Sequence, residues 1–128
     1  MGTWGVGNFD CDAAADHLGV LAGKLVAEVG EAMAGDPVGL EPDEYGGVSV
    51  PCNLELLLVL VRQGWVGVTL PPPEVIGAWQ ERFLGVWERT IDDLEPDPAY
   101  KDARRVVLNE TFERLAEASA AVRGAASR

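Results

Sequence analysis

The sequence predicts an all-α fold: a compact bundle of four main helices with an irregular N-terminal arm. Apolar residues recur at helical spacing in four long segments, and segments rich in proline or glycine separate these four from one another. No turn signal typical of a β-hairpin joins two alternating runs. The 128 residues suit a single α-helical domain, residues 1–128, which is large enough to bury a core.

The first helix is expected to run from a cap at Asp10 to about Ala34. The Asp10 carboxylate can accept hydrogen bonds from the first backbone N–H groups, and Asp12 lies near the positive end of the helix dipole. Gly35 and the residues after it end the pattern. The apolar residues share one side of this helix: Leu18, Leu21, Ala22, Leu25, Val29 and Met33.

The second helix is expected over Asn53–Gln63, after a short acidic segment and the break at Gly46-Gly47. This stretch is apolar nearly all round, which is typical of a helix in the middle of a bundle. A buried strand has a similar composition, but Asn53 at the start and Gly64 after the end favour a helix. Glu55 then lies in the first turn, where the dipole stabilises it. The alternative is a buried Glu55 paired with Arg62.

Residues 64–70 are expected to form an extended connector packed on the core, with a short strand as the alternative. The third helix follows Pro71-Pro72-Pro73 and runs to about Asp92, because proline suits the first turn of a helix. The fourth begins near Pro98. The residues expected to face inward are Val75, Ile76, Trp79, Phe83, Val86 and Trp87 in the third helix, and Leu108, Phe112, Leu115 and Val122 in the fourth.

The charge of the chain limits the class of its partners. Ten basic residues stand against 21 acidic ones, which gives a net charge of −11. Binding to nucleic acid or to an anionic membrane requires basic residues, so we expect neither partner. A basic protein suits this charge, although acidity can also serve solubility alone.

The two cysteines, Cys11 and Cys52, have neither a metal-binding spacing nor the number that a disulfide framework requires. We expect free thiols in a reducing compartment. The N-terminus lacks the charged and apolar regions of a signal peptide. The longest apolar run, Leu56–Val61, is too short to span a bilayer. These observations predict a cytoplasmic protein.

The N-terminal arm contains Trp4 and Phe9 among several glycines. Glycine allows a close backbone approach, so the arm could be a recognition loop. The favoured interpretation is structural: Trp4 and Phe9 fill grooves between helices and hold the arm on the bundle.

Three segments resemble a known family. The opening Met-Gly-Thr-Trp-Gly is followed by Gly7, Phe9-Asp10, Asp12, Ala14-Ala15 and Asp16; the later segments are Leu40–Glu44 and Asn53–Leu57. Together they resemble the bacterial family known as domain of unknown function 4259, although larger residues replace the alanines usual in the last segment. The family has no established activity. The resemblance therefore implies a helical fold and a bacterial origin, and it implies no ligand or catalytic residue.

Two sets of carboxylates could bind a cation. Asp10, Asp12 and Asp16 could combine with acids of the later segments, but they lack the spacing of a calcium loop. Two helical Glu-x-x-Glu pairs resemble the paired carboxylates with which all-α nucleotide pyrophosphohydrolases hold magnesium: Glu28 with Glu31, and Glu110 with Glu113. Solvated helix faces and helix dipoles explain both sets without a metal.

The favoured functional hypothesis is a protein-binding or accessory module, of the immunity or regulator type, with a basic protein as partner. A magnesium-dependent nucleotide hydrolase and a structural homo-oligomer are the alternatives. We predict no catalytic residue, no metal ligand and no cofactor. The candidate binding or structural residues are Trp4, Asp10, Asp12, Glu41, Asp43, Glu44 and Glu55.

Overall fold

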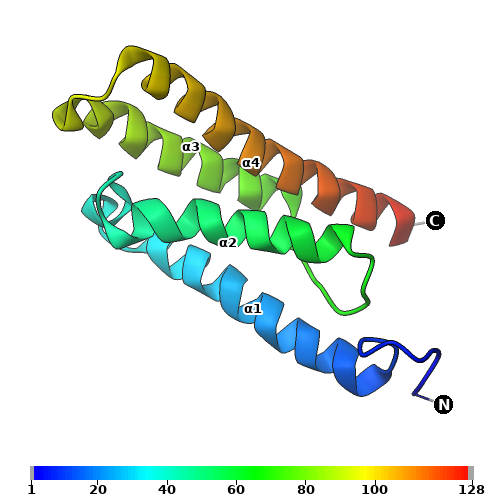
Figure 1. The fold of residues 1–128 in the computed structure, drawn as a ribbon. Helices are drawn as coiled ribbons and strands as arrows, with labels where there is room; N and C mark the ends of the chain where they lie inside the picture. Colours follow the sequence, from blue (N-terminus) through cyan, green and yellow to red (C-terminus); the bar gives the residue numbers. More distant parts are fainter. Residues whose placement is uncertain (1, 127–128) are drawn as a thin grey trace.

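The computed structural model describes residues 2–126 and has the predicted fold, an all-α bundle of four main helices (Figure 1). Successive helices run in opposite directions along the bundle. The elements are α1 (Asp12–Ala34), the 3-10 turn η1 (Pro37–Leu40), α2 (Tyr45–Arg62), α3 (Pro73–Thr90), the 3-10 turn η2 (Ile91–Leu94) and α4 (Pro98–Ala126).

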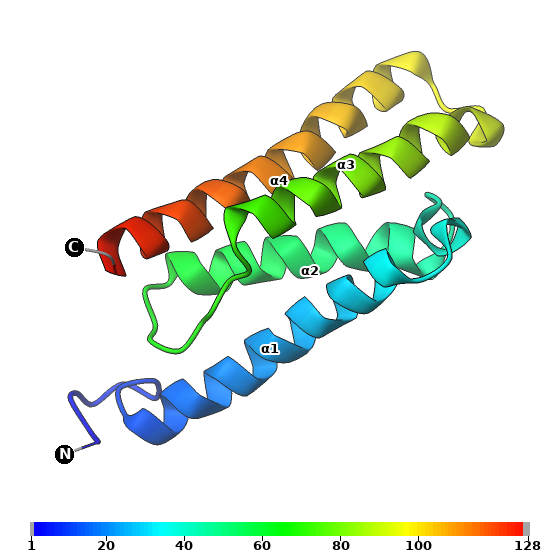
Figure 2. The same cartoon turned by 180° about the vertical axis from the view of Figure 1, so that it is seen from behind.

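The helices form two antiparallel hairpins that pack through their second members. α1 packs on α2, α2 on α4, and α4 on α3, whereas α1 and α3 touch only slightly. Figures 1 and 2 show that α2 and α4 run side by side in the same direction. The loops that contain η1 and η2 lie together at one end of the bundle, and the N-terminal arm lies at the other.

Apolar side chains of all four helices form one core. α2 lies centrally, so Leu54 and Leu57 are fully buried between its neighbours. The ring centroids of Phe83 and Phe112 lie 5.6 Å apart and join α3 to α4. The segment over residues 64–70 is a connector and not a strand, but it contains turns where the sequence predicts an extended chain. Much of it is exposed, and it returns to the core at Leu70.

α2 begins at Tyr45, eight residues before the predicted start at Asn53. The sequence prediction treated Gly46-Gly47 as a break, but both glycines are helical. A side-chain carbon at Gly47 would collide with the carbonyl oxygen of Glu41, so glycine allows this turn to pack directly on the backbone after η1. Pro51 is inside the helix and removes one backbone hydrogen bond without ending it.

The start of α1 also differs from the prediction. The cap residue is Cys11, and the Asp10 carboxylate accepts a hydrogen bond from the backbone N–H of Gly7 instead, at 2.9 Å. Asp10 therefore closes a turn in the arm and does not cap the helix. Asp12 lies in the first turn, as predicted.

Most predicted core residues are buried or partly buried, but α2, which the sequence places in the middle of the bundle, leaves Leu56 and Val59 about half exposed. Three more exceptions lie in the other helices. Leu21, Val75 and Val122 are exposed by 42%, 38% and 52%. α1 has only one close helical neighbour, α2, so its buried stripe is narrow and Leu21 lies at the edge. Val75 and Val122 lie near helix ends, and α4, with 29 residues, is longer than its 18-residue neighbours.

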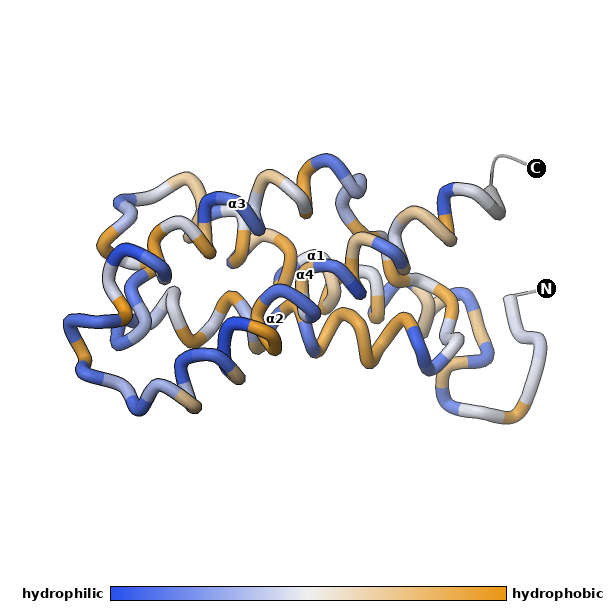
Figure 3. The backbone as a smooth tube through the Cα atoms, turned by 90° about the horizontal axis from the view of Figure 1, so that it is seen from above, coloured by the Kyte–Doolittle hydropathy of each residue, from blue (hydrophilic) through white to orange (hydrophobic). Residues whose placement is uncertain are grey.

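α2 is the most hydrophobic helix in Figure 3. By length and composition alone it could cross a membrane, and 39% of its residues are buried inside the protein. The core helix of a soluble protein has the same properties, and the packing of α2 between α1 and α4 fits that role.

Candidate functional site

The N-terminal arm folds back on the start of α1. The backbone N–H of Trp4 donates to the carbonyl oxygen of Asp10 at 2.9 Å. The backbone N–H of Asp12 donates to the carbonyl oxygen of Gly2 at 2.6 Å. Thr3 and Cys11 form an antiparallel bridge between these bonds. The arm is therefore ordered, which agrees with the expectation that it docks.

The aromatic residues of the arm do not fill grooves between helices. Phe9 stacks on Trp65 of the connector, with ring centroids 4.2 Å apart and planes at 19°. Trp4 is 50% exposed beside a shallow hollow that Asp12 and Val66 also line. The prediction of a buried Trp4 is wrong: the arm folds on the start of α1 and leaves half of the Trp4 side chain in water. Trp65 is a partner that the sequence analysis missed.

The candidate carboxylates lie at opposite ends of the molecule. Asp10, Asp12 and Asp16 surround the start of α1, whereas Glu41, Asp43 and Glu44 follow its far end. At about 1.5 Å per residue, the 23 residues of α1 separate the two groups by roughly 35 Å. Within residues 2–126, no three His, Cys, Asp or Glu side chains come together in a way that could hold a metal ion.

Glu55 is neither in a first turn nor buried. Because α2 begins at Tyr45, Glu55 lies in the middle of this helix, and its side chain is exposed. Asn53, expected at the start of the helix, is buried in the contact with α1. Its amide donates to the carbonyl oxygen of Leu25 at 3.3 Å and to the carboxylate of Glu28 at 2.8 Å.

The two Glu-x-x-Glu pairs do not converge. Glu28 and Glu31 border a hollow between α1 and the start of α2. Glu110 and Glu113 are on α4, which packs on α2 and α3 rather than on α1, and Glu110 pairs with Arg114 at 3.1 Å. The arrangement of four carboxylates around a metal that the hydrolase hypothesis requires is not formed.

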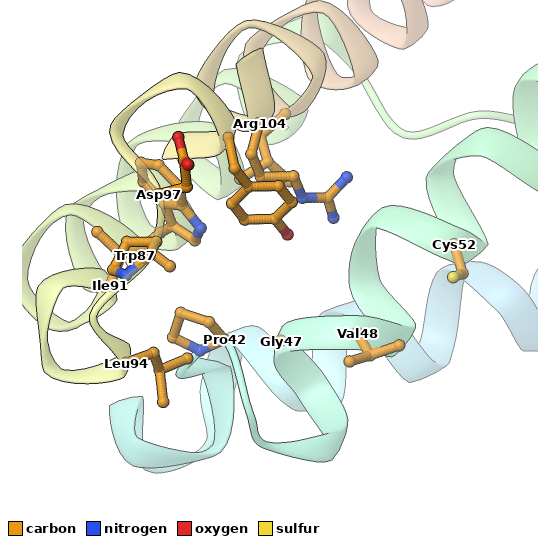
Figure 4. Close-up of a pocket in the computed structure, with 12 residues that line it drawn as sticks. Pro42, Gly47, Val48, Cys52, Trp87, Ile91, Leu94, Asp97 and Arg104 are labelled. Carbon is orange, nitrogen blue, oxygen red and sulfur yellow. The ribbon is translucent and has the colours of Figure 1, made fainter. Parts of the chain in front are cut away.

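One cavity, which we call the loop-end pocket, has a volume of about 530 Å³. It opens between α2 and α4 beside both 3-10 turns (Figure 4). Figure 4 shows Trp87, Ile91 and Leu94 on one side and Val48 and Cys52 on the other. The residues that line it are Pro42, Gly47, Val48, Cys52, Trp87, Ile91, Leu94, Pro96, Asp97, Tyr100, Arg104 and Leu108.

Arg104 is the basic residue of this pocket. Its guanidinium points across the pocket toward α2 (Figure 4), and within residues 2–126 it has no hydrogen-bond or ion-pair partner. The next residue, Arg105, is fully engaged elsewhere: it pairs with Glu88 and Asp102 and lies 5.4 Å from the centre of the Trp87 ring. Arg104 is therefore available to a ligand in a way that Arg105 is not.

The ion pair of Arg105 shifts the protonation of both partners. Hydrogen bonds donated by Arg105 hold the pKa of the Glu88 carboxyl below its ordinary value of 4.5. The carboxylate in turn raises the pKa of Arg105. This pair joins α3 to α4 and belongs to the bundle rather than to a reactive site.

Two acidic segments lie at the end of the bundle where the loop-end pocket is, and Asp97 of the second lines the pocket. Residues 36–44 and residues 92–97 each contain four acids and no base. Both segments lie at the same end of the bundle (Figure 1). Glu41 and Asp43 flank the pocket residue Pro42 in the sequence. The sequence analysis singled out the first of these acidic segments but had no signal that the second lies beside it.

Cys11 and Cys52 are both free thiols, and Cys52 is exposed in the loop-end pocket. The sequence analysis did not identify the pocket, although Leu94 within an acidic segment and Tyr100 beside the final proline break were signals of surface apolar residues.

Comparison with protein-family models, curated proteins and solved structures finds no match. The resemblance of the opening motif to domain of unknown function 4259 stays a prediction. The arrangement of this chain's own residues therefore carries the functional argument.

Proposed function

We propose that this protein is a protein-binding module of the immunity or regulator type, and that its partner is a basic protein. The supporting observation is the uneven distribution of charge between the two helical hairpins. Residues 1–62 contain ten acids against Lys24 and Arg62, a net charge of −8, whereas residues 63–128 contain 11 acids against eight bases, a net charge of −3.

Ion pairing makes this difference larger. Four ion pairs occur within residues 2–126, and all of them join residues of the second hairpin: Lys101–Asp92, Arg105–Glu88, Arg105–Asp102 and Arg114–Glu110. The acids of the first hairpin have no ion-pair partner in that part of the chain. Their mutual repulsion opposes folding, and a basic partner would relieve it.

Unpaired surface carboxylates have a direct use in association. A negative field attracts a positively charged protein over a distance set by the Debye length, about 10 Å at 0.1 M salt. Such steering raises the association rate and selects partners by charge. Exposed charges contribute little to stability, so a binding surface can contain many of them while the fold stays intact.

The proposal is tested by affinity capture from the native organism with the full chain as bait. A basic protein should be retained at about 0.05 M salt and released toward about 0.5 M, because added salt screens the attraction. The variant Glu41→Gln/Asp43→Asn/Glu44→Gln should associate with the captured protein several-fold more slowly. The acidic row of α4 is the second candidate contact surface, and Glu110→Gln/Glu113→Gln/Glu117→Gln should likewise slow association if the partner binds there.

Two results would overturn the proposal. If the bait captures only further copies of itself, and salt does not affect this capture, the result would support a homo-oligomer. Magnesium-dependent turnover of nucleotides that is lost in Glu28→Gln and in Glu113→Gln would support the hydrolase, even though these glutamates lie on helices that do not pack together.

A further inference from the structure

We infer that the loop-end pocket and the exposed apolar stripe of α2 beyond it bind the apolar face of a basic amphipathic helix of the partner. This inference rests on the proposed function and adds the binding surface and the form of the ligand. The pocket volume of about 530 Å³ lies within the range of known ligand pockets, about 300–1,000 Å³. Its walls are mainly apolar, so it favours an apolar group.

The apolar surface extends beyond the pocket along α2. Val48, Cys52, Leu56 and Val59 follow one another at intervals of three or four residues, so they share one face of the helix. All four are exposed; Val48, Leu56 and Val59 are each about half accessible. An unbroken exposed stripe of this length on a helix is typical of a contact surface.

α4 forms the opposite wall at the pocket end of this stripe. α2 and α4 lie side by side and run in the same direction (Figures 1 and 2), and Tyr100 and Arg104 of α4 line the pocket together with Val48. We call the pocket together with the exposed stripe of α2 the groove. An apolar surface of this length accepts a third helix, whose side chains at positions i, i+3 or i+4, and i+7 contact it.

The charge around the groove determines the sign of the charge that the ligand should have. The two acidic loops place eight carboxylates at the pocket end, and two of them, Asp93 and Glu95, flank the pocket residue Leu94. Within residues 2–126, Asp92 is the one member of the eight in an ion pair, with Lys101, and the other seven have none. Lysine and arginine at the edges of the bound helix would meet these carboxylates, which is the charge complementarity that commits the groove to a basic ligand.

Arg104 is the cationic hydrogen-bond donor of the pocket. Its guanidinium has no partner within residues 2–126, so it can donate to a carbonyl or carboxylate oxygen of the bound helix.

The same charges disfavour two other occupants. A second copy of this chain would bring the same acidic loops and a net charge of −11 to the groove. An anionic membrane would be repelled for the same reason.

The experiment uses a synthetic amphipathic helix of about 15 leucine and lysine residues with one apolar face, the length at which isolated helices become marginally stable. A peptide with glutamate in place of lysine is its control. The full-length Cys11→Ser variant leaves Cys52 as the reporter, and iodoacetamide measures its accessibility. Binding of the lysine peptide should slow the alkylation of Cys52 about tenfold, at an occupancy near 90%, and the glutamate peptide should leave the rate unchanged.

Two substitutions locate the contact. Leu94→Ser removes an exposed apolar residue of the pocket and should weaken peptide binding about fivefold to tenfold. Leu21→Ser, which removes a similarly exposed leucine from α1, should have no effect. Both side chains are about half exposed, so circular dichroism and the melting curve should show an intact fold for both variants.

Each contrary outcome has a distinct meaning. If the lysine peptide binds while Cys52 reacts at its usual rate and Leu94→Ser binds normally, the groove is the wrong surface, although a basic partner is still supported. Equal protection by the glutamate peptide would contradict the basic character of the ligand. Protection of Cys52 without peptide that rises with protein concentration would identify a second copy as the occupant. Absence of peptide binding would overturn the inference, and absence of any captured basic protein as well would overturn the proposed function.

Discussion

The two helical hairpins of this protein are held together in different ways. In the second hairpin, α3 and α4 are joined by Phe83 against Phe112 and by ion pairs such as Arg105–Glu88. In the first, α1 and α2 are joined by apolar packing and by the amide of Asn53, and the turn between them packs backbone against backbone. Ion pairs link charged side chains of the second hairpin, whereas the acids of the first hairpin form none within residues 2–126.

This difference indicates where the molecule can interact. A carboxylate that is already paired must lose its partner before it can bind anything else, and that loss opposes association. The free carboxylates of the first hairpin and of the loop containing η2 carry no such penalty. Beside the apolar groove, the acids of residues 36–44 form no ion pair within residues 2–126, and among those of residues 92–97 only Asp92 does.

The largest expected effect tests the backbone contact of the first hairpin. Gly47→Ala places a carbon against the carbonyl oxygen of Glu41, and backbone on both sides cannot move freely. We expect a loss of about 3 kcal/mol or more in the free energy of unfolding, measured in urea. Gly77→Ala in α3 is the matched control: nothing lies near the added carbon, and a stabilisation of about 0.5–1 kcal/mol is expected. Equal effects of the two substitutions would remove the distinction between the hairpins.

The next effect compares one polar contact from each hairpin. Asn53 is buried and bonds to α1, whereas Gln80 is partly buried and donates to Asn109 of α4 at 2.9 Å. Asn53→Ala should reduce the free energy of unfolding by about 1–3 kcal/mol, because the carbonyl oxygen of Leu25 loses a partner in a site with little water. Gln80→Ala should cost about 1 kcal/mol or less, since water can replace the amide. A larger effect at Gln80 would contradict the assignment of Asn53 as the main polar link.

A smaller effect is expected in the N-terminal arm. Phe9→Ala should cost about 2 kcal/mol in unfolding free energy, because Phe9 is partly buried and stacks on Trp65. Trp4→Ala should cost less than about 1 kcal/mol, since half of Trp4 is already in water. Trp65→Ala should lower the free energy of unfolding by about as much as Phe9→Ala. The loss in the double variant should be smaller than the sum of the two single losses, because the two rings contact each other. If Trp4→Ala lowered the melting temperature more than Phe9→Ala does, the result would support a buried Trp4.

The smallest effect depends on pH and belongs to the second hairpin. Because Arg105 lowers the pKa of Glu88, the stability that this pair contributes is complete above the ordinary pKa of 4.5 and is lost as the pH falls through the lower value of the folded state. Glu88→Gln should therefore melt about 1–3 °C below the natural protein at pH 7. The difference should shrink as the pH falls below 4.5 and disappear below the lowered pKa that Glu88 has in the folded state. Glu55→Gln in the first hairpin, where the exposed carboxylate has no ion pair within residues 2–126, is the matched control and should melt within about 1 °C of the natural protein at pH 7.

The sequence by itself determined the class of fold and most of the core. Apolar residues at a period of 3.6 place Leu18, Val29, Phe83 and Phe112 inward wherever a helix meets the bundle, because this period is a property of the helix alone. The proline breaks before α3 and α4 act equally locally, since proline suits a first turn and disrupts a preceding one. The excess of acids and its location in residues 1–62 can be counted without a structure.

Only the tertiary structure decided where α2 begins and what surrounds the candidate residues. Gly46 and Gly47 end a helix in isolation, but here they allow a helical turn to approach the neighbouring backbone, and that contact is invisible in the sequence. The partners of Phe9 and Asn53, the pairing of some carboxylates and not others, and the loop-end pocket all depend on segments distant in the chain. A local pattern specifies the conformation of a segment, but which surfaces meet depends on the packing of the whole bundle.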